Sequence, residues 1–331
     1  MYPANQTIPQ TTPTVASGRR RAHPTPRRLR PTEMTVLTGD GVELAVRDFG
    51  HASADHTVVL LHGLCVSDAV WSNQINHLLH RYGDSVRVIS YDHRGHGRSS
   101  HAHADTYHID QLAGDLAEVL RTLNVAGRLT LVGHSMGGMT ALAYLGRPSA
   151  ERPVEPRGLV LLATAAGKLA HHGLGRLLAI PGAGTLLRLV DRLPGNTLQS
   201  LARPVSSTLS RIWPAQRVML TAVAGAVADA PMPTAIGFLP GLRRYDQRRT
   251  LRHIRARTVI VSGGADPLTP ASHSRELAGA IPGATHVDVP HAGHMLPREV
   301  PHVVNDAIRR VMAPQSSRER TSRHHHTGAP R

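Results

Sequence analysis

The stretch Leu131–Gly138, LVGHSMGG, holds the pattern G-x-S-x-G around Ser135. An apolar run precedes the pattern and a helical pattern follows it, which is the strand–turn–helix context that this motif needs. The sharp turn forces the serine into a strained backbone conformation. Side chains two residues to either side would collide, so Gly133 and Gly137 are required. The hydroxyl then lies at a helix N-terminus, whose amide groups favour a developing negative charge. We therefore predict that Ser135 is a nucleophile.

Short apolar runs alternate with helical patterns on both sides of this turn. Runs of this kind suit strands buried on both faces of a parallel sheet. They are Thr57–Leu61, Val86–Tyr91, Leu129–Gly133, Leu159–Ala163 and Thr258–Ser262, and Val42–Phe49 alternates like a half-exposed strand. The helical patterns are Asp110–Leu123, Met136–Leu145, Ser272–Ala280 and Pro301–Val311. This alternation predicts an α/β fold with a doubly wound, mostly parallel sheet.

The pattern divides the chain into a core, an insertion and two tails. Residues 166–250 break the alternation with Leu/Arg/Gly/Pro stretches and an Ala/Val helical pattern, so we expect a helical cap or lid inserted between two strands. The core then comprises residues 32–165 and 251–313. Residues 1–31 and 314–331 have almost no large apolar side chains, and we expect both to be disordered basic tails.

The net charge of +15 first suggests an acidic partner, either a nucleic acid or a membrane surface. Residues 1–31 carry +6 and residues 314–331 carry +3, which leaves +6 for residues 32–313. Much of the charge therefore lies outside the expected folded body. Nucleic-acid binding also needs a recognition fold or stacking aromatics, and only 3% of the residues are aromatic. We expect no specific nucleic-acid partner.

The cysteine content and the hydropathy of the chain bear on its cellular compartment. Cys65 is the single cysteine, so no intramolecular disulfide forms, and we expect it to be an inert, buried small side chain. No stretch reaches the roughly 18 apolar residues that span a bilayer, and no apolar segment follows the N-terminal arginines. We expect a cytoplasmic protein. Weak association with a membrane surface through the basic tails or the cap is left open, with Gly173–Arg192 either an amphipathic surface segment or a pair of lid helices.

The chain resembles the α/β-hydrolase superfamily, in particular its serine hydrolases of the esterase, lipase and haloperoxidase-like type. The resemblance rests on the motif around Ser135 and on further motifs in the expected chain order, and it covers roughly residues 34–165 and 251–312. It is weaker across residues 166–250, where these enzymes carry variable caps. It implies a catalytic triad with no cofactor and no metal ion.

A serine hydroxyl is a poor nucleophile without a base, and the base needs a third group that holds its tautomer. In the superfamily the chain order is Ser, acid, His. The resemblance therefore implies Asp266, in the loop GGADP, as the acid and His294, in HAGHM, as the base. His291 is the local competitor for the base. Asp266 has an alternative interpretation as a cap of the following turn.

Acyl transfer also needs hydrogen-bond donors directed at the oxyanion. One is the backbone N–H of Met136, directly after the nucleophile. The resemblance implies that the second is the backbone N–H of Leu64, after the turn residues His62 and Gly63. Trp71 is expected to pack beneath this loop.

The loop DHRGHGRS, residues 92–99, also matches the superfamily. We expect it to have a structural role, with Asp92 and Arg94 paired to hold the loop and Gly95 and Gly97 at positive φ. Asp115, inside a helical pattern, is expected to be a solvated charge on the helix face.

These residues predict a serine hydrolase that cleaves carboxylic esters through an acyl-enzyme on Ser135. The cap contains few aromatics and many Leu, Ala and Val residues, which favours an aliphatic acyl or monoacylglycerol-like substrate. A thioesterase, a perhydrolase or haloperoxidase-like enzyme and a C–C bond hydrolase remain open on the same triad. A catalytically silent binding protein is the alternative from another class, and the complete Ser/Asp/His set argues against it.

Overall fold

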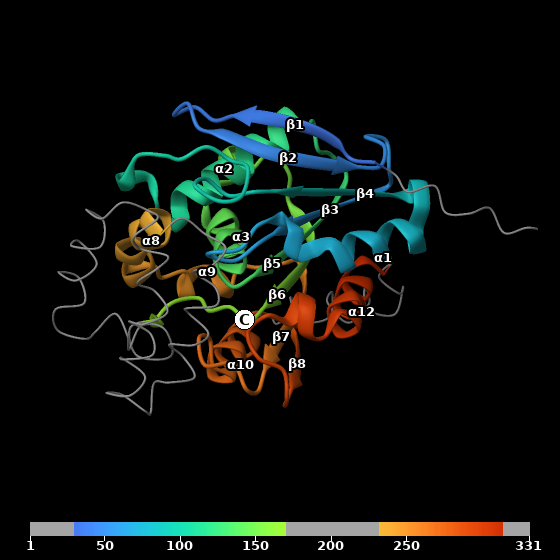
Figure 1. The fold of residues 1–331 in the computed structure, drawn as a ribbon. Coiled ribbons are helices and arrows are strands. Elements are labelled where there is room, and N and C mark those ends of the chain that lie inside the picture. The colour runs from blue at the N-terminus through green and yellow to red at the C-terminus, as the bar shows by residue number, and fades with distance from the viewer. Residues whose placement is uncertain (1–29, 170–231, 314–331) are drawn as a thin grey trace, which may run out of the picture.

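In the part of the chain that the structure describes, eight strands form one sheet in the order β1-β2-β4-β3-β5-β6-β7-β8 (Figure 1). The structure is a computed structural model that describes residues 30–169 and 232–313. The strands are β1 (Thr32–Leu37), β2 (Glu43–Phe49), β3 (His56–Leu61), β4 (Val86–Tyr91), β5 (Arg128–His134), β6 (Pro156–Leu162), β7 (Arg257–Gly263) and β8 (Thr285–Val289). β2 is antiparallel to both β1 and β4, and the remaining pairs are parallel. The predicted α/β fold class is confirmed.

Burial explains why the apolar runs became strands. Every residue of β3 and of β4 is buried, as expected for central strands covered on both faces. β2 alternates between buried and more exposed positions, which agrees with the half-exposed strand predicted there. β1, which no sequence pattern predicted, pairs with β2 at the edge of the sheet.

Helices cover the two faces of the sheet with separate apolar clusters (Figure 1). One cluster includes Leu116 of α2, Leu142 of α3 and Leu277 of α10, and the other includes Leu78 of α1 and Ile308 of α12. The helices are α1 (Ser72–Tyr82), α2 (Ile109–Thr122), α3 (Met136–Gly146), α8 (Met232–Arg244), α9 (Arg248–Leu251), α10 (Ala271–Ala280), α11 (Leu296–Glu299) and α12 (Pro301–Met312). Among the described helices, none is long and apolar enough to cross a bilayer.

The expected insertion falls between β6 and β7. Two helices of that part of the chain, α8 and α9, lie within the described residues. Most of the predicted cap, including Gly173–Arg192, lies outside them, as do residues 1–29 and 314–331. The division into core, cap and tails therefore stays a prediction.

The loop after β4 is held differently from the expectation. Asp92 does not pair with Arg94, because its carboxylate accepts the backbone N–H groups of Asp68 at 2.8 Å and Arg98 at 2.9 Å. Gly95 and Gly97 have φ of +73° and +52°, which confirms the positive φ predicted for both. A Cβ at Gly97 would collide with the Asp92 carboxylate. Asp92 thus closes the loop through main-chain contacts.

Arg94 instead joins three distant segments. Its guanidinium donates to Asp115 of α2 at 2.6 and 2.7 Å and to Asp40, in the turn between β1 and β2, at 2.7 and 3.1 Å. The prediction that Asp115 is a solvated charge is wrong, since Arg94 and Asp115 are 0% and 1% exposed. Bidentate geometry offsets the cost of removing these two charges from water.

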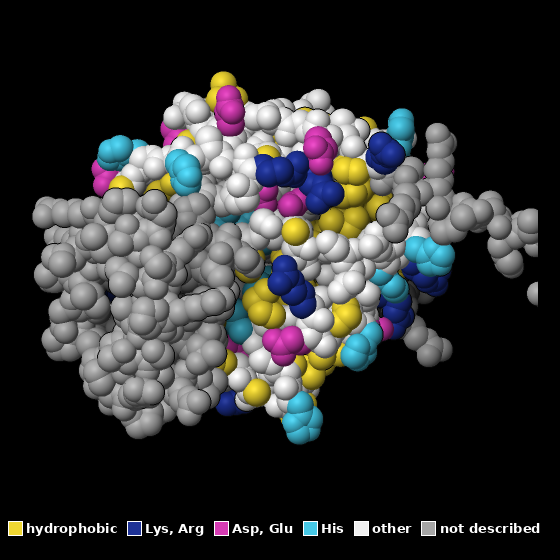
Figure 2. All heavy atoms as spheres, viewed as in Figure 1, with side chains coloured by type: hydrophobic (Ala, Val, Ile, Leu, Met, Phe, Trp, Pro, Cys, Tyr) yellow, Lys and Arg dark blue, Asp and Glu magenta, His cyan; other side chains and the backbone are white. Residues whose placement is uncertain are grey.

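The surface around β2 and β4 has mixed charge. Figure 2 shows basic and acidic side chains next to one another there, and the ion pairs recorded near β1 include Arg98 with Glu33 at 3.2 Å and Arg47 with Glu33 at 3.6 Å. Exposed pairs of this kind contribute little stability.

We predict that Asp115→Ala lowers the free energy of unfolding by about 3–5 kcal/mol, because the buried Arg94 guanidinium then lacks its Asp115 partner. Urea denaturation measures the change. Glu118→Ala in the same helix, which removes only a surface pair with Arg121, is the matched control and should cost less than about 1 kcal/mol. Equal effects of the two substitutions would contradict the buried network.

Candidate active site

Ser135 occupies the turn between β5 and α3 with φ +53° and ψ −117°. A positive φ is uncommon for a residue with a side chain and persists only where the surroundings enforce it. Here the Ser135 N–H donates to the carbonyl of Leu162 at 2.9 Å, and the Thr164 hydroxyl donates to the Ser135 carbonyl at 2.7 Å. The strand β6 and the residues after it thus hold the strained turn in place.

The two glycines of the motif are needed for close packing. A Cβ at Gly133 would lie 2.5 Å from the carbonyl oxygen of Gly137, and a Cβ at Gly137 would collide with the carbonyl of Leu61 in β3. The prediction that neither position accepts a side chain is confirmed. The turn after β5 therefore lies directly against the end of β3, where the loop that contains Leu64 begins.

His294 and Asp266 meet at the carboxyl edge of the sheet, where active sites of open α/β folds form. Asp266 follows β7 and His294 follows β8. His294 Nδ1 donates to Asp266 Oδ2 at 2.8 Å. Because the proton lies on Nδ1, Nε2 of the neutral ring is the free acceptor.

The Asp266 carboxylate is fully buried but well satisfied. It accepts the backbone N–H groups of Leu268 and Thr269 at 2.8 and 3.1 Å and the Thr269 hydroxyl at 2.7 Å. Burial by itself raises the pKa of Asp266, but His294 and the Thr269 hydrogen bonds outweigh burial and lower the pKa below its ordinary value. Asp266 therefore stays ionised beside the imidazole.

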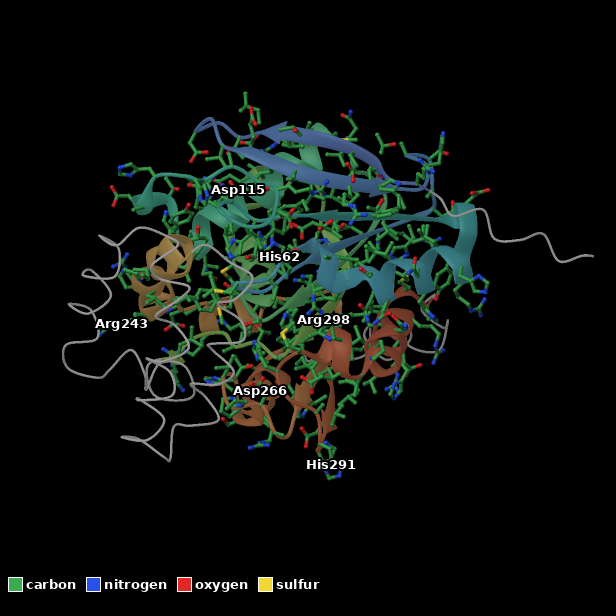
Figure 3. The ribbon with its side chains drawn as sticks, viewed as in Figure 1. His62, Asp115, Arg243, Asp266, His291 and Arg298 are labelled. Carbon is green, nitrogen blue, oxygen red and sulfur yellow. The ribbon has the colours of Figure 1, made fainter. Side chains whose placement is uncertain are left out.

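The structure distinguishes the two candidate bases. His291 is exposed and projects outward at the lower rim, whereas Asp266 lies inside the molecule (Figure 3). Of the two histidines, His294 is the one that contacts the buried carboxylate.

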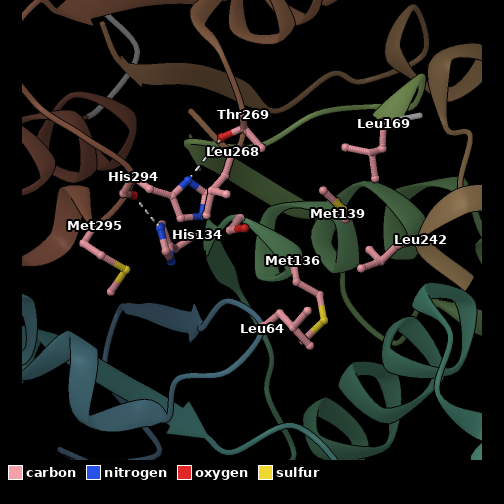
Figure 4. A pocket seen from close by; sticks show the side chains of 11 residues that line it. Leu64, His134, Met136, Met139, Leu169, Leu242, Leu268, Thr269, His294 and Met295 are labelled. Atoms are coloured by element: carbon pink, nitrogen blue, oxygen red, sulfur yellow. Dashed lines mark hydrogen bonds between the residues drawn. The ribbon is translucent and has the colours of Figure 1, made fainter. Parts of the chain in front are cut away.

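Ser135 and His294 line the same cavity. Figure 4 shows His294 with other residues of this lining. The other walls of the cavity are mainly apolar side chains from the loop after β3, from α3, from the two sides of residues 170–231 and from the loop after β7: Leu64, Met136, Met139, Leu169, Leu242 and Leu268. The described lining contains no Asp, Glu, Lys or Arg. This cavity suits an uncharged, aliphatic group next to the serine.

Leu64 and Met136, the two expected oxyanion donors, both line this cavity. Within residues 30–169 and 232–313, neither backbone N–H donates a hydrogen bond to another residue. Both N–H groups are therefore free to bind a ligand oxygen. Trp71 is buried and packs in the same apolar cluster as Leu60 at the end of β3, as expected for a residue beneath the loop.

Two buried histidines near the site, His62 and His96, were not recognised as functional candidates from sequence. His62 donates from Nδ1 to the Gly63 carbonyl at 2.7 Å, and its Nε2 accepts the His93 backbone N–H at 2.9 Å. His96 Nε2 accepts the backbone N–H of Cys65 at 3.2 Å. These bonds fix the main chain on both sides of Leu64. The signal in the sequence was the high density of histidine in two glycine-rich loops. Composition alone could not distinguish these histidines from the others in the chain.

Cys65 is buried, as expected, and burial raises the pKa of its thiol to about 12. It is not among the residues that line the described cavity. In the part of the chain that the structure describes, no group of three or more His, Cys, Asp or Glu side chains is arranged to hold a metal ion.

Comparison with known proteins agrees with this architecture. The family model for the "alpha/beta hydrolase fold" matches residues 56–299, which is more than half of the chain. The chain belongs to the α/β-hydrolase fold family.

Relatives of this α/β hydrolase include proteins named as a hydrolase and as a lipase. It is 30% identical over 276 residues to "Putative carbamate hydrolase RutD" of Variovorax paradoxus (strain S110), which covers 80% of this chain and 96% of the relative. It is 27% identical over 261 residues to "sn-1-specific diacylglycerol lipase ABHD11" of Mus musculus, covering 77% and 80%. The solved structure of the esterase EaEST from Exiguobacterium antarcticum has a TM-score of 0.63 at 23% identity, covering 85% of this chain and 100% of that one. These likenesses support a hydrolase.

The buried histidines of this α/β hydrolase make its stability depend on pH. Burial lowers the pKa of His62 to about 4 and the pKa of His134 and His96 to about 3. Below the ordinary pKa of 6.5, the unfolded chain binds protons at these rings and the folded chain does not. Stability is therefore fully present above pH 6.5 and falls as the pH decreases toward 4.

We predict that the free energy of unfolding falls between pH 7.5 and pH 5.0, by on the order of 1–2 kcal/mol for each of these histidines. Urea denaturation at both pH values measures it, and the interval from pH 7.5 to pH 9.0 is the control in which these rings do not titrate. Equal stability at pH 7.5 and pH 5.0 would show that the rings are not buried as neutral groups.

Proposed function

We propose that this α/β hydrolase is a serine hydrolase that cleaves carboxylic esters through an acyl-enzyme on Ser135. The observation that carries the proposal is the buried Asp266 carboxylate bonded to His294, at a cavity that His294 shares with Ser135. This is the combination of nucleophile, base and orienting group that acyl transfer requires.

The reaction follows from the positions of the proton and the charge. Ser135 Oγ attacks the ester carbonyl, and His294 Nε2 takes the hydroxyl proton. Asp266 holds the ring and stabilises the imidazolium that forms. The N–H groups of Leu64 and Met136 bind the tetrahedral oxyanion. His294 then protonates the leaving alcohol, and a water molecule, deprotonated by the same ring, releases the acid from Ser135.

The cavity favours a neutral aliphatic acyl chain, such as that of a monoacylglycerol-like ester. Leucine and methionine side chains bury such a chain well, whereas a carboxylate there would lose its water without gaining a cationic partner from the described lining. The similarity to a relative named as a diacylglycerol lipase supports this substrate class. Cleavage of a thioester or of a C–C bond would use the same triad with a different leaving group, and a perhydrolase would use it with hydrogen peroxide in place of water as the acyl acceptor.

We predict that Ser135→Ala lowers kcat/KM for p-nitrophenyl esters by about 10⁴-fold or more and abolishes labelling by a fluorophosphonate, because both reactions need the serine oxygen. A spectrophotometric assay and gel fluorescence measure the two effects. Retained turnover and labelling in this variant would rule out Ser135 as the nucleophile.

The matched control uses the two neighbouring histidines. His294→Ala should be as inactive as Ser135→Ala, and His291→Ala should keep kcat/KM near that of the unchanged protein. An inactive His291→Ala beside an active His294→Ala would reverse the assignment of the base.

We predict that p-nitrophenyl hexanoate is hydrolysed with a kcat/KM at least about tenfold higher than the mono-p-nitrophenyl ester of succinate, because the second substrate brings a carboxylate into the apolar cavity. Leu242→Lys, which adds a cation to the wall, should narrow the difference. A preference for the succinyl ester would contradict the aliphatic assignment. An acyl-CoA preferred over every oxygen ester would identify a thioesterase.

A further inference from the structure

His134, the last residue of β5 and the neighbour of Ser135, has no part in the reaction described above. Its side chain is 1% exposed. Nε2 lies 2.8 Å from the backbone carbonyl oxygen of His294, and the two ring centroids are 4.9 Å apart (Figure 4). A carbonyl oxygen can only accept, so Nε2 of His134 carries the proton and donates it.

The other edge of the same ring contacts the oxyanion loop. A Cβ at Gly63 would lie 3.0 Å from His134 Nδ1 and 3.3 Å from its Cε1. The ring therefore packs against the main chain of Gly63, directly before Leu64. One imidazole thus touches both the loop that carries the proposed base and the loop that carries a proposed oxyanion donor.

The surroundings keep this imidazole neutral. Burial lowers the pKa of His134 to about 3, and positive charge on His294 or His62 lowers it further, whereas Asp266 and the bond to the His294 carbonyl raise it. Nδ1 has no hydrogen-bond partner among the described residues, so a second proton there would be buried without an acceptor. The ring keeps a single donor, and its direction is fixed.

Asp266 alone does not fix the position of the base. The bond from His294 Nδ1 to Asp266 restrains rotation of the imidazole, but the ring also moves with the backbone from which it extends. The bond from His134 restrains that backbone at its carbonyl. His134 directly precedes Ser135 in the chain. It therefore couples the position of the His294 ring to the position of Ser135.

We propose that His134 is a positioning residue that holds the His294 loop and the Gly63–Leu64 loop in register with Ser135 through its Nε2–H donor. The inference rests on the proposed roles of Ser135 and His294. It assigns to the residue before the nucleophile a function in geometry, and no proton moves through it during the reaction.

The test compares His134→Gln with His134→Met. The two side chains have the same length and are unbranched at Cβ and Cγ, but only glutamine offers an N–H near the position of Nε2. We expect His134→Met to lower kcat by about 10- to 100-fold, as a displacement of about 1 Å in a reacting group does, with KM within about threefold. The rate of fluorophosphonate labelling should fall in parallel. His134→Gln should recover most of both rates.

The pH profile of kcat/KM separates positioning from proton transfer. In His134→Gln the fall in activity at acidic pH should remain, because the proposed base, His294, is unchanged in this variant. Loss of that acidic limb would make His134 a proton carrier and overturn the proposal. Full activity in His134→Met, or equal losses in Met and Gln, would overturn it as well. If His134→Met does not fold by circular dichroism and thermal melting, the activity and pH profile of His134→Gln decide the question: low activity contradicts the proposal.

Ser135→Ala separates this inference from the function on which it rests. If Ser135→Ala is active, the proposed reaction is wrong, whatever the role of His134. If Ser135→Ala is inactive and His134→Met is unimpaired, the proposed reaction is supported and only the positioning role of His134 is rejected.

Discussion

The contact between the turn after β5 and the end of β3 is the constraint on which the rest of this site depends. At Gly137 the main chain of one segment lies against the Leu61 carbonyl of another with no room for a methyl group. Ser135 has a positive φ at this turn and lines one cavity with residues of the loops after β3, β7 and β8. The strain is offset by main-chain and hydroxyl bonds from the residues at and after the end of β6. Backbone packing therefore positions the proposed nucleophile Ser135 and the proposed oxyanion donor Met136 before any other side chain of the site is considered.

Around that turn, the protein uses one buried carboxylate and several neutral imidazoles. Asp266 is held ionised by His294 and by Thr269, while burial keeps His62, His96 and His134 unprotonated. A neutral ring can donate at one nitrogen and accept at the other, so each histidine can join two main-chain segments without adding charge. A positive charge at His134, which feels the field of Asp266, would compete with His294 for that carboxylate.

The sequence predicted the parts of the site that depend on local order and missed those that depend on distant contacts. Sequence reasoning found the glycine spacing around Ser135 and the chain order of Ser135, Asp266 and His294. It could do so because each of these three residues follows an apolar run that forms a strand. Asp115 reads as an ordinary helix-face acid, since its partner Arg94 lies 21 positions away and the third member, Asp40, is 54 positions from that arginine. His134 gave no signal either, because its acceptor is a main-chain carbonyl 160 positions later, which no side-chain pattern encodes.

Leu169 and Leu242 lie on opposite sides of residues 170–231 in the chain, and both line the cavity beside Ser135. The strands on either side, β6 and β7, are directly paired with each other in the sheet. A change of sequence or length between these two leucines can therefore reshape the chamber while the sheet, the nucleophile turn and the acid loop keep their pairing. Proteins with this arrangement can evolve new substrate preferences by replacing a single stretch of chain. Such a replacement costs the sheet and the proposed catalytic residues little stability.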